Sequence, residues 1–435
     1  MIYKYNPKIT NILFGILLLQ YSLISINPPL FTHNIKLKKN DKCMVIGCGI
    51  SGLTTAYYLL QKHPNMNITI VDKNKDIAQG TSYGPASEML WNKIKKGGKY
   101  KFTYESFSQM VSIMKAYIYN LFSKEQSIDE INGYLQKCYK LYKRAIDDLK
   151  LDKKYHHDTG CLYLFENKNK FNFNKNLYKN NNNLVFYTKS EYKSSPYYNK
   201  LFDSIDVCGY VFDKQSGYVD AQNFCIDFYK KLKIKFGNRL KLILNTEVTK
   251  INSQNKYDLV VLCCGIQNKE MLKNNNIKGG ETLVGMKGYT LTGRLKNKIK
   301  TDIKYAFCYV TKNGPYFGRK FIDKHYALRI GGMASGYNPN DKNKINNKLV
   351  DKYMLTIIKK FSYAKTDKIN YDNYIDDDKI ELWSGVREFD YRNIYSGCTL
   401  YTSNPRVLVS GGLGSNGYVY CWKTGSDLAD MIKTK

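Results

Sequence analysis

The most informative stretch of the sequence reads Cys43-Met44-Val45-Ile46-Gly47-Cys48-Gly49-Ile50-Ser51-Gly52. Its first four residues are typical of a short buried strand, and a Gly-x-Gly-x-x-Gly loop follows directly. Residues 53–61 (LTTAYYLLQ) have helical composition with an apolar face, and residues 68–71 form a second apolar run that ends at Asp72. Strand, glycine loop, helix, strand and acid in this order are the full βαβ context of a dinucleotide-binding fingerprint.

Each part of this unit has a physical role in binding a dinucleotide. Gly47 allows the tight turn out of the strand, Gly49 lets the backbone approach a pyrophosphate, and Gly52 lets the helix pack closely on the strand. The N–H groups and the dipole at the helix N-terminus attract phosphates. The carboxylate of Asp72 is placed to accept from ribose hydroxyls, and it disfavours the 2′-phosphate of NADP. The predicted binding residues of this unit are Val45, Ile46, Gly47, Cys48, Gly49, Ile50, Ser51, Gly52, Asp72 and Lys73.

A second glycine-rich segment lies near the carboxyl end of the chain. Residues 406–410 read as a strand, residues 411–417 (GGLGSNG) as a loop, and residues 418–431 as a helix. Further strands are expected over 242–248 and within 256–265. The first unit alone leaves FAD and NAD open, but two glycine segments at opposite ends suit a long extended cofactor held by one discontinuous domain. This reading adds as cofactor-binding residues Val248, Cys264, Gly265, Gly412, Gly414, Ser415, Asn416 and Gly417.

At this point the sequence resembles the D-amino-acid oxidase superfamily of FAD enzymes, in particular the bacterial D-amino-acid dehydrogenase branch (small subunit type). The matching segments are residues 80–84 (GTSYG), 155–165 (YHHDTGCLYLF), 217–224 (GYVDAQNF), 287–292 (KGYTLT) and 329–334 (RIGGMA). The resemblance runs from about Cys43 to the end of the chain. It implies FAD as the cofactor, with Thr81 and Ser82 in the segment that reaches the flavin side. The last two segments are specific to this branch and imply a D-amino acid substrate.

Two departures from the family pattern concern the region over the flavin. The family's Gly-Leu-Arg-Pro segment corresponds here to residues 383–393 (WSGVREFDYRN), which keep Arg387 but lack the proline and a following Asp-Gly turn. The family's carboxyl-terminal Gly-His-Gly is Gly412-Leu413-Gly414 in this chain.

The chemistry of an amino acid substrate indicates which residues are catalytic. A buried carboxylate needs a fixed cation, and Arg387 can hold it bidentately so that the Cα–H faces flavin N5. The alternative is that Arg387 pairs with Glu381 or Asp390. Tyr289 either donates a hydrogen bond to the substrate or only packs. The reaction expected from this site is hydride transfer from Cα to the flavin, followed by hydrolysis to a 2-oxo acid and ammonia.

The predicted fold class is α/β, with a discontinuous Rossmann-type FAD-binding domain and a second, mainly antiparallel-sheet α+β substrate domain. We expect a leader or membrane anchor with a linker over 1–40. The FAD-binding domain is expected over 41–150, 205–275 and 385–435, and the substrate domain over 151–204 and 276–384. Apolar periodicity predicts helices through 107–121 and 131–149. The Asn- and Lys-rich segment 167–183 is interpreted as a solvated loop.

Composition sets further bounds on function. The 435 residues are 43% hydrophobic, which excludes wholesale disorder, and 68 Lys+Arg against 37 Asp+Glu give a net charge of +31. The basic residues are mostly Lys, occur with abundant Asn, Tyr and Ile, and are scattered along the chain, which favours codon bias over a nucleic-acid site. Eleven Cys without a Cys-x-x-Cys pair and five His indicate a reducing compartment and no metal site.

The amino terminus carries a pattern that is typical of a targeting signal. Residues 12–26 (ILFGILLLQYSLISI) are almost uninterrupted apolar sequence, too short for a typical membrane span but suited to a signal peptide or anchor; the alternative is an ordinary core helix. We therefore expect an enzyme that is membrane-associated, through peripheral contact, or that is carried by an N-terminal leader into the mitochondrion or another organelle. The expected partners are a small amino-acid substrate and an electron acceptor that is quinone-like or oxygen.

Two other functions stay open from the sequence. One is another amine or amino-acid oxidase of the superfamily, of the glycine or sarcosine type. The other is a tRNA-modifying flavoprotein, for which a single dense basic face around the mouth of the flavin site would be expected. A covalent flavin link through Cys398 is a minor alternative.

Overall fold

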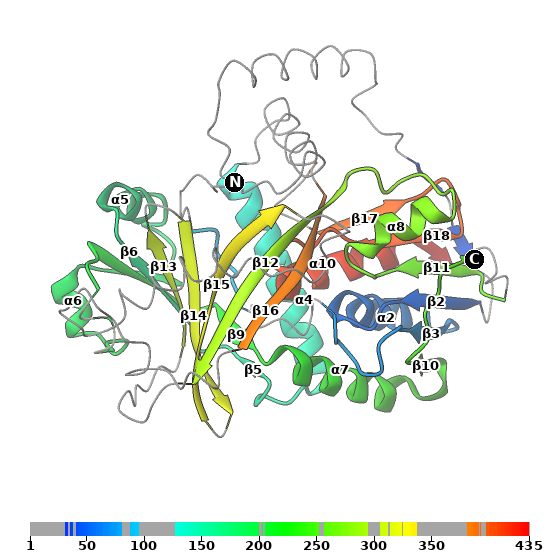
Figure 1. Cartoon of the computed structure of the whole chain (residues 1–435), viewed down its shortest axis with the longest axis horizontal. Helices are drawn as coiled ribbons and strands as arrows, with labels where there is room; N and C mark the ends of the chain where they lie inside the picture. The colour runs from blue at the N-terminus through cyan, green and yellow to red at the C-terminus, as the bar shows by residue number, and fades with distance from the viewer. Residues whose placement is uncertain are drawn as a thin grey trace, which may run out of the picture.

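Figure 1 shows the computed structural model of the chain, with one mixed sheet among helices and a larger sheet beside it. It describes residues 31–33, 35–37, 41–80, 88–94, 127–199, 202, 205–251, 256–294, 305–311, 314–323, 325–336, 381–390, 392 and 397–434. For residues 289–294, 311, 314–323, 325–336 and 381–384 the description is limited to the backbone. The predicted α/β class with a parallel and an antiparallel sheet is confirmed.

The smaller of the two large sheets has six strands in the order β10-β3-β2-β11-β18-β17. Neighbouring strands are parallel except β17 with β18, and the strands come from segments far apart in the sequence. Most residues of the central strands are buried, as expected for parallel strands covered on both faces. The strand bounds are Leu240–Ile243 (β10), Asn67–Val71 (β3), Lys42–Ile46 (β2), Leu259–Leu262 (β11), Val407–Gly411 (β18) and Cys398–Tyr401 (β17).

Two parallel helices follow strands of this sheet and pack directly on each other. Helix α2 (Ile50–Lys62) follows β2, and helix α10 (Gly417–Asp430) follows β18. Their backbones approach closely at Gly425 of α10, where an added Cβ would lie only 2.9 Å from the carbonyl carbon and oxygen of Thr54 in α2. Both helices therefore start at the same edge of the sheet.

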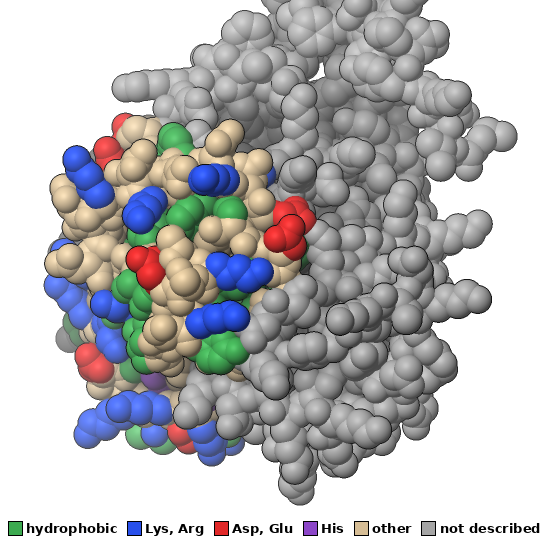
Figure 2. All heavy atoms as spheres, turned by 90° about the vertical axis from the view of Figure 1, so that its left-hand side faces the viewer, with side chains coloured by type: hydrophobic (Ala, Val, Ile, Leu, Met, Phe, Trp, Pro, Cys, Tyr) green, Lys and Arg blue, Asp and Glu red, His purple; other side chains and the backbone are tan. Residues whose placement is uncertain are grey.

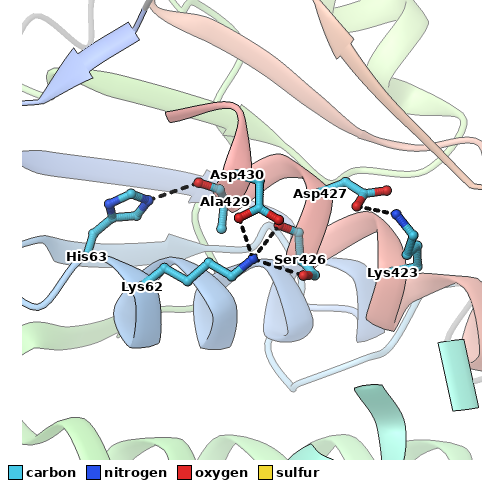
Figure 3. Close-up of polar contacts among 7 residues, drawn as sticks. All are labelled: Lys62, His63, Lys423, Ser426, Asp427, Ala429 and Asp430. Carbon is cyan, nitrogen blue, oxygen red and sulfur yellow. Dashed lines mark hydrogen bonds and ion pairs between the residues drawn. The ribbon is translucent and has the colours of Figure 1, made fainter. Parts of the chain in front are cut away.

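Polar contacts join the carboxyl ends of these two helices (Figure 3). Lys62 Nζ donates to the Asp430 carboxylate at 2.7 Å and to the Ser426 Oγ at 3.0 Å. A ring nitrogen of His63 lies 3.0 Å from the carbonyl oxygen of Ala429. These contacts fix the relative position of the helices at the end away from their N-termini.

Other helices cover the sheet or connect its strands. Helix α4 (Ile128–Leu149) begins at a capping box of Ser127 and Glu130, and α7 (Ala221–Phe236) and α8 (Gln267–Asn274) follow later in the chain. The Trp422 ring of α10 stacks on Phe228 of α7 at 5.6 Å between ring centroids. The helix predicted over 131–149 is confirmed, and the one predicted over 107–121 lies outside the described residues.

The larger sheet has eight strands in the order β16-β12-β15-β14-β13-β6-β8-β7. All neighbours are antiparallel except β13 with β6. Strands β16 and β12 form the edge that lies beside the smaller sheet (Figure 1). The strand bounds are Glu381–Asp390 (β16), Leu283–Arg294 (β12), His325–Gly336 (β15), Gly314–Asp323 (β14), Ala306–Thr311 (β13), Cys161–Phe165 (β6), Gly209–Asp213 (β8) and Leu184–Tyr187 (β7). The residue ranges of the two domains stay a prediction.

Short elements complete the described fold. A three-stranded sheet joins β4, β9 and β5, and a parallel pair joins β1 and β19 near the two ends of the described chain. The bounds are Glu88–Met89 (β4), Gly217–Val219 (β9), His156–His157 (β5), Ile35–Leu37 (β1), Ile432–Thr434 (β19), Lys189–Lys193 (α6) and the 3-10 helix Gly237–Arg239 (η3).

The loop predicted over 167–183 is wrong, because the structure has helix α5 (Lys168–Leu177) there. The side chain of Asn167 caps the helix by accepting from the Lys170 backbone N–H at 3.1 Å. Phe171 and Asn174 are buried one turn apart and attach the helix to the larger sheet. Composition indicated a loop, but a cap and a buried stripe of the right spacing are enough to form a helix.

The strand predicted over 242–248 also differs from the structure. β10 ends at Ile243, and Asn245 has a positive φ of 53°, which turns the chain out of the sheet. Asn245 N–H instead donates to the Asn74 carbonyl at 2.8 Å. The turn brings Val248 and its two predecessors to the edge of the sheet, where they line the cavity described below.

Figure 2 shows how charged side chains are distributed over one face of the molecule. Lys and Arg side chains are spread over the described part of this face, with Asp and Glu among them. Among the residues that the structure describes, no helix is long and apolar enough to cross a membrane. Residues 12–26 lie outside the described residues.

Candidate functional site

A cavity of about 410 Å³ opens where the carboxyl ends of the parallel strands meet β16 of the larger sheet. Its walls come from the ends of β2, β3, β11 and β18, the first turns of α2 and α10, and residues 385–388 of β16. This is the edge at which open α/β sheets bind nucleotides. Of the predicted cofactor residues, those that line it are Ile46, Gly47, Gly49, Ile50, Ser51, Asp72, Lys73, Val248, Cys264, Gly265, Gly414, Ser415 and Gly417.

The glycine loop after β2 is held in a conformation that only small residues allow. Gly47 has a φ of 108°, and a Cβ there would lie 2.5 Å from the carbonyl oxygen of Cys263. A Cβ at Gly52 would lie 1.9 Å from the carbonyl oxygen of Gly47. The loop therefore packs against β11 and against its own helix with no room for a side chain.

The acid at the end of β3 fixes this loop. Asp72 Oδ2 accepts from the Cys48 backbone N–H at 2.6 Å, and Oδ1 accepts from the Asn74 backbone N–H at 2.8 Å. Asp72 also lines the cavity. Its carboxylate thus joins the two strand ends and presents acceptor oxygens beside the glycine loop.

Two helix N-termini point at the cavity. The N-cap of α2 is Gly49, which has no side chain to cap the helix. The N-cap of α10 is Asn416, whose side chain makes no cap hydrogen bond within the described residues. Helix N-termini attract anions through their N–H groups and dipole. Gly414, with φ of 55°, has no room for a Cβ beside the Phe389 ring and turns the chain into α10.

Five predicted cofactor residues lie behind the cavity wall and support it. Val45 and Cys48 are fully buried, Gly52 packs under the loop, and Gly412 donates its N–H to the Glu388 carboxyl. Asn416 donates from Nδ2 to the Tyr420 hydroxyl at 3.0 Å. Thr81 and Ser82 lie outside the described residues. The binding roles of all these residues stay predictions.

The structure places Arg387 on the cavity wall, in β16. Its guanidinium lies over Gly288 of β12, where an added Cβ would be 2.8 Å from the Arg387 Cζ. Asp390, the alternative partner from the sequence, instead pairs with Arg392 at 2.6 Å. The backbone of Tyr289 pairs with Ser384, and its side chain lies outside the description.

Sequence reasoning missed part of the cavity wall. Glu388 lines the cavity although it is buried, and Asn268, buried behind it, donates from Nδ2 to its carboxyl oxygen at 3.1 Å. The sequence did contain a hint of Glu388, because it directly follows Arg387 at the position where the family pattern has proline. Other lining residues that were not predicted include Asn74, Ala78, Thr246, Glu247, Ser410 and Gly411.

Cys398 does not lie in the cavity wall. It lies under the glycine turn, where a Cβ at Gly412 would be 2.6 Å from its Sγ. Burial raises the pKa of the Cys398 thiol well above its usual value, and Asp390 and Glu388 raise it further. A covalent flavin link needs the thiolate, which this setting disfavours. In the described part of the chain, no three His, Cys, Asp or Glu side chains are grouped as metal ligands.

Residues 42–431 match the family model described as FAD dependent oxidoreductase (DAO). The chain belongs to this family of FAD-dependent oxidoreductases. The family resemblance expected from the sequence and FAD as the cofactor are thereby confirmed.

Solved structures of the same fold are similar over nearly the whole chain. The L-proline dehydrogenase from P. horikoshii has a TM-score of 0.62 and 16% identity, covering 91% of this chain and 94% of that one. Glycine oxidase from Geobacillus kaustophilus has a TM-score of 0.62 and 14% identity, covering 91% and 96%. The L-alpha-glycerophosphate oxidase from Mycoplasma pneumoniae, solved with FAD bound, has a TM-score of 0.61 and 14% identity, covering 91% and 95%. No curated protein matches the chain.

The residues around the cavity fit FAD. A dinucleotide needs a glycine loop that allows close approach, positive helix ends for the two phosphates, and an acceptor for ribose hydroxyls. The loop 47–52, the first turns of α2 and α10, and the Asp72 carboxylate supply these groups at one edge of the sheet.

Proposed function

We propose that this FAD-dependent oxidoreductase oxidises the Cα–N bond of an amino acid, and that D-amino acids are its substrate class. The observation that carries the proposal is the position of Arg387 on the wall of the cofactor cavity. The two segments specific to the D-amino-acid dehydrogenase branch, 287–292 and 329–334, lie on β12 and β15. These strands and β16 are neighbours in the sheet, so all three motifs lie at one edge of it.

The role of Arg387 follows from the chemistry of the substrate. A guanidinium holds a carboxylate through two parallel N–H bonds, which fixes the orientation of Cα as well as its position. Gly288 leaves the space that the guanidinium occupies. When bound, FAD supplies the acceptor for the hydride that leaves Cα. Water then hydrolyses the released imine to a 2-oxo acid and ammonia.

The named activities of the similar structures support an amine substrate. Proline dehydrogenase and glycine oxidase act, by their names, on amino acids, whereas glycerophosphate oxidase acts on a phosphate ester with a hydroxyl group. A glycine- or sarcosine-type oxidase is therefore the second candidate. A tRNA-modifying role stays the third alternative from the sequence.

We further propose a quinone-like acceptor and a membrane-associated or organellar location, both of which rest on the apolar segment 12–26. A leader or anchor of this kind brings an enzyme to a membrane, where quinones are dissolved. The purified protein should then react slowly with oxygen and quickly with a soluble quinone analogue. Rapid peroxide formation in air would contradict this acceptor.

The test of the proposed function is anaerobic bleaching of the bound flavin by a panel of D-amino acids, glycine, sarcosine and L-proline. We expect D-amino acids to reduce the flavin fastest. Faster reduction by glycine or sarcosine would favour the second candidate. No reduction by any member of the panel would contradict an amino acid substrate while leaving FAD binding untouched.

A further inference from the structure

Glu388 is a buried carboxyl group in the cavity wall that the proposed reaction does not use. It is 5% exposed and follows Arg387 on β16. Its Oε2 accepts from the Gly412 backbone N–H at 2.8 Å and from Asn268 Nδ2 at 3.1 Å. Its Oε1 is also buried and has no hydrogen-bond partner among the described residues. One oxygen is thus satisfied, and the other is free to carry a proton.

The contacts of Glu388 join three chain segments around the cavity. Asn268 Oδ1 accepts from the Cys264 backbone N–H at 2.8 Å, so the Asn268 amide bridges the end of β11 to the carboxyl group. The Glu388 carbonyl accepts from the Gly414 backbone N–H at 2.7 Å. A Cβ at Gly411 would lie 2.2 Å from the Glu388 Oε2. The side chain therefore fills the space that a glycine leaves and holds the turn that starts α10.

Burial decides the protonation state of this group. Loss of water raises the pKa of Glu388 to about 8, because burial outweighs the hydrogen bonds from Gly412 and Asn268 that lower it. Asp390 on the same strand raises the pKa further, and Lys269 on α8 lowers it.

Other titratable groups face Glu388 from neighbouring strands. Cys263 and Cys264 follow β11, and Cys398 lies on β17. Burial raises the pKa of Cys263 to about 12 and raises the pKa of the other two thiols as well. Arg392 holds Asp390 in an ion pair. The thiols therefore stay protonated in the pH range where Glu388 ionises.

We propose that Glu388 is a positioning residue of the FAD site that works as a neutral acid, and that its ionisation weakens FAD binding. In the neutral form it holds the turn 411–414 without adding charge to the cavity wall. As a carboxylate it adds a negative charge beside a cavity that has to accept two phosphates. Because binding and ionisation are linked, bound FAD favours the protonated acid, and ionisation disfavours bound FAD. This role of Glu388 requires FAD binding alone and is independent of the substrate.

The experiment measures FAD release from the holoenzyme by its fluorescence on dilution, between about pH 6.5 and about pH 9.5. The variants are Glu388→Gln, which keeps the volume and an acceptor oxygen, and Asp213→Asn as a matched control. Asp213 is also a fully buried carboxyl group whose pKa is raised by burial, but it lies on β8 and outside the cavity wall. Near-ultraviolet circular dichroism at each pH reports whether each variant is folded.

We expect the FAD dissociation constant of the wild type to rise about tenfold above the pKa of Glu388. The dissociation constant of Glu388→Gln should stay level across the range, and Asp213→Asn should follow the wild type. A purely structural role would leave the pH dependence of Glu388→Gln parallel to that of the wild type, with the dissociation constant raised by the same factor at every pH, and this would overturn the proposal. A wild-type dissociation constant that does not change with pH would overturn the proposal as well. This measurement is valid even if a variant fails to fold.

Discussion

The carboxylate of Asp72 accepts a hydrogen bond of 2.6 Å from the backbone N–H of Cys48. Asp72 ends β3 and Cys48 lies in the glycine loop after β2, so this bond joins the two halves of the βαβ unit. The sequence predicts Asp72 as a ribose ligand. The structure adds that the same carboxylate holds the loop against which the pyrophosphate is expected to bind.

Replacing Asp72 should weaken FAD binding for both reasons. Asp72→Ala leaves the Cys48 N–H without its acceptor, and a lost partner of a buried donor costs about 1–3 kcal/mol. We expect the FAD dissociation constant, measured by flavin fluorescence, to rise by about tenfold or more. Asp76→Asn is the control, because Asp76 is exposed and its carboxylate accepts from Gln79 in the described part of the chain. Equal affinities for Asp72→Ala and Asp76→Asn would show that Asp72 has no part in the site.

Two glycine-to-alanine substitutions should change stability in opposite directions. A Cβ at Gly52 would lie 1.9 Å from the Gly47 carbonyl oxygen, so Gly52→Ala must move the loop and should destabilise the fold by about 3 kcal/mol or more. Gly133 lies in α4 with nothing within 4 Å of an added Cβ, and Gly133→Ala should stabilise by about 0.5–1 kcal/mol. Urea unfolding measures both. A stable, FAD-binding Gly52→Ala protein would be incompatible with the close packing of loop and helix.

The stability of the protein should depend on pH through Glu388. Its pKa is about 8 in the folded chain against an ordinary value of 4.5, so between these values the folded state binds the proton and the unfolded state does not. The free energy of unfolding therefore falls as pH rises through this window. The advantage of wild type over Glu388→Gln should shrink by about 1–3 kcal/mol from pH 5 to pH 8. Urea midpoints at the two pH values measure it, and an advantage that grows with pH would refute the assignment.

The parts of the fold that local sequence determines could be predicted, and those that depend on packing could not. Gly52 must be glycine because an added Cβ would meet the carbonyl oxygen of Gly47, five residues earlier in the chain, and the glycine spacing of the motif shows this directly. Glu388 takes its role from Asn268 and Gly412, which lie far away in the sequence, and no local pattern predicts that meeting. The composition of segment 167–183 led to the prediction of a loop. The cap at Asn167 and the spacing of Phe171 and Asn174 were the signals in the sequence for helix α5.

The most direct test of the account is whether Arg387 recognises a substrate carboxylate beside bound FAD. The measurement is the anaerobic rate of flavin reduction in wild type and Arg387→Ala, for the best D-amino acid and for the amine that lacks only its carboxylate. We predict that the substitution slows reduction by the amino acid about a hundredfold or more, leaves the slow reduction by the amine unchanged, and leaves FAD bound. Equal loss with both compounds, or no loss with either, would contradict the role of Arg387 and with it the proposed substrate class.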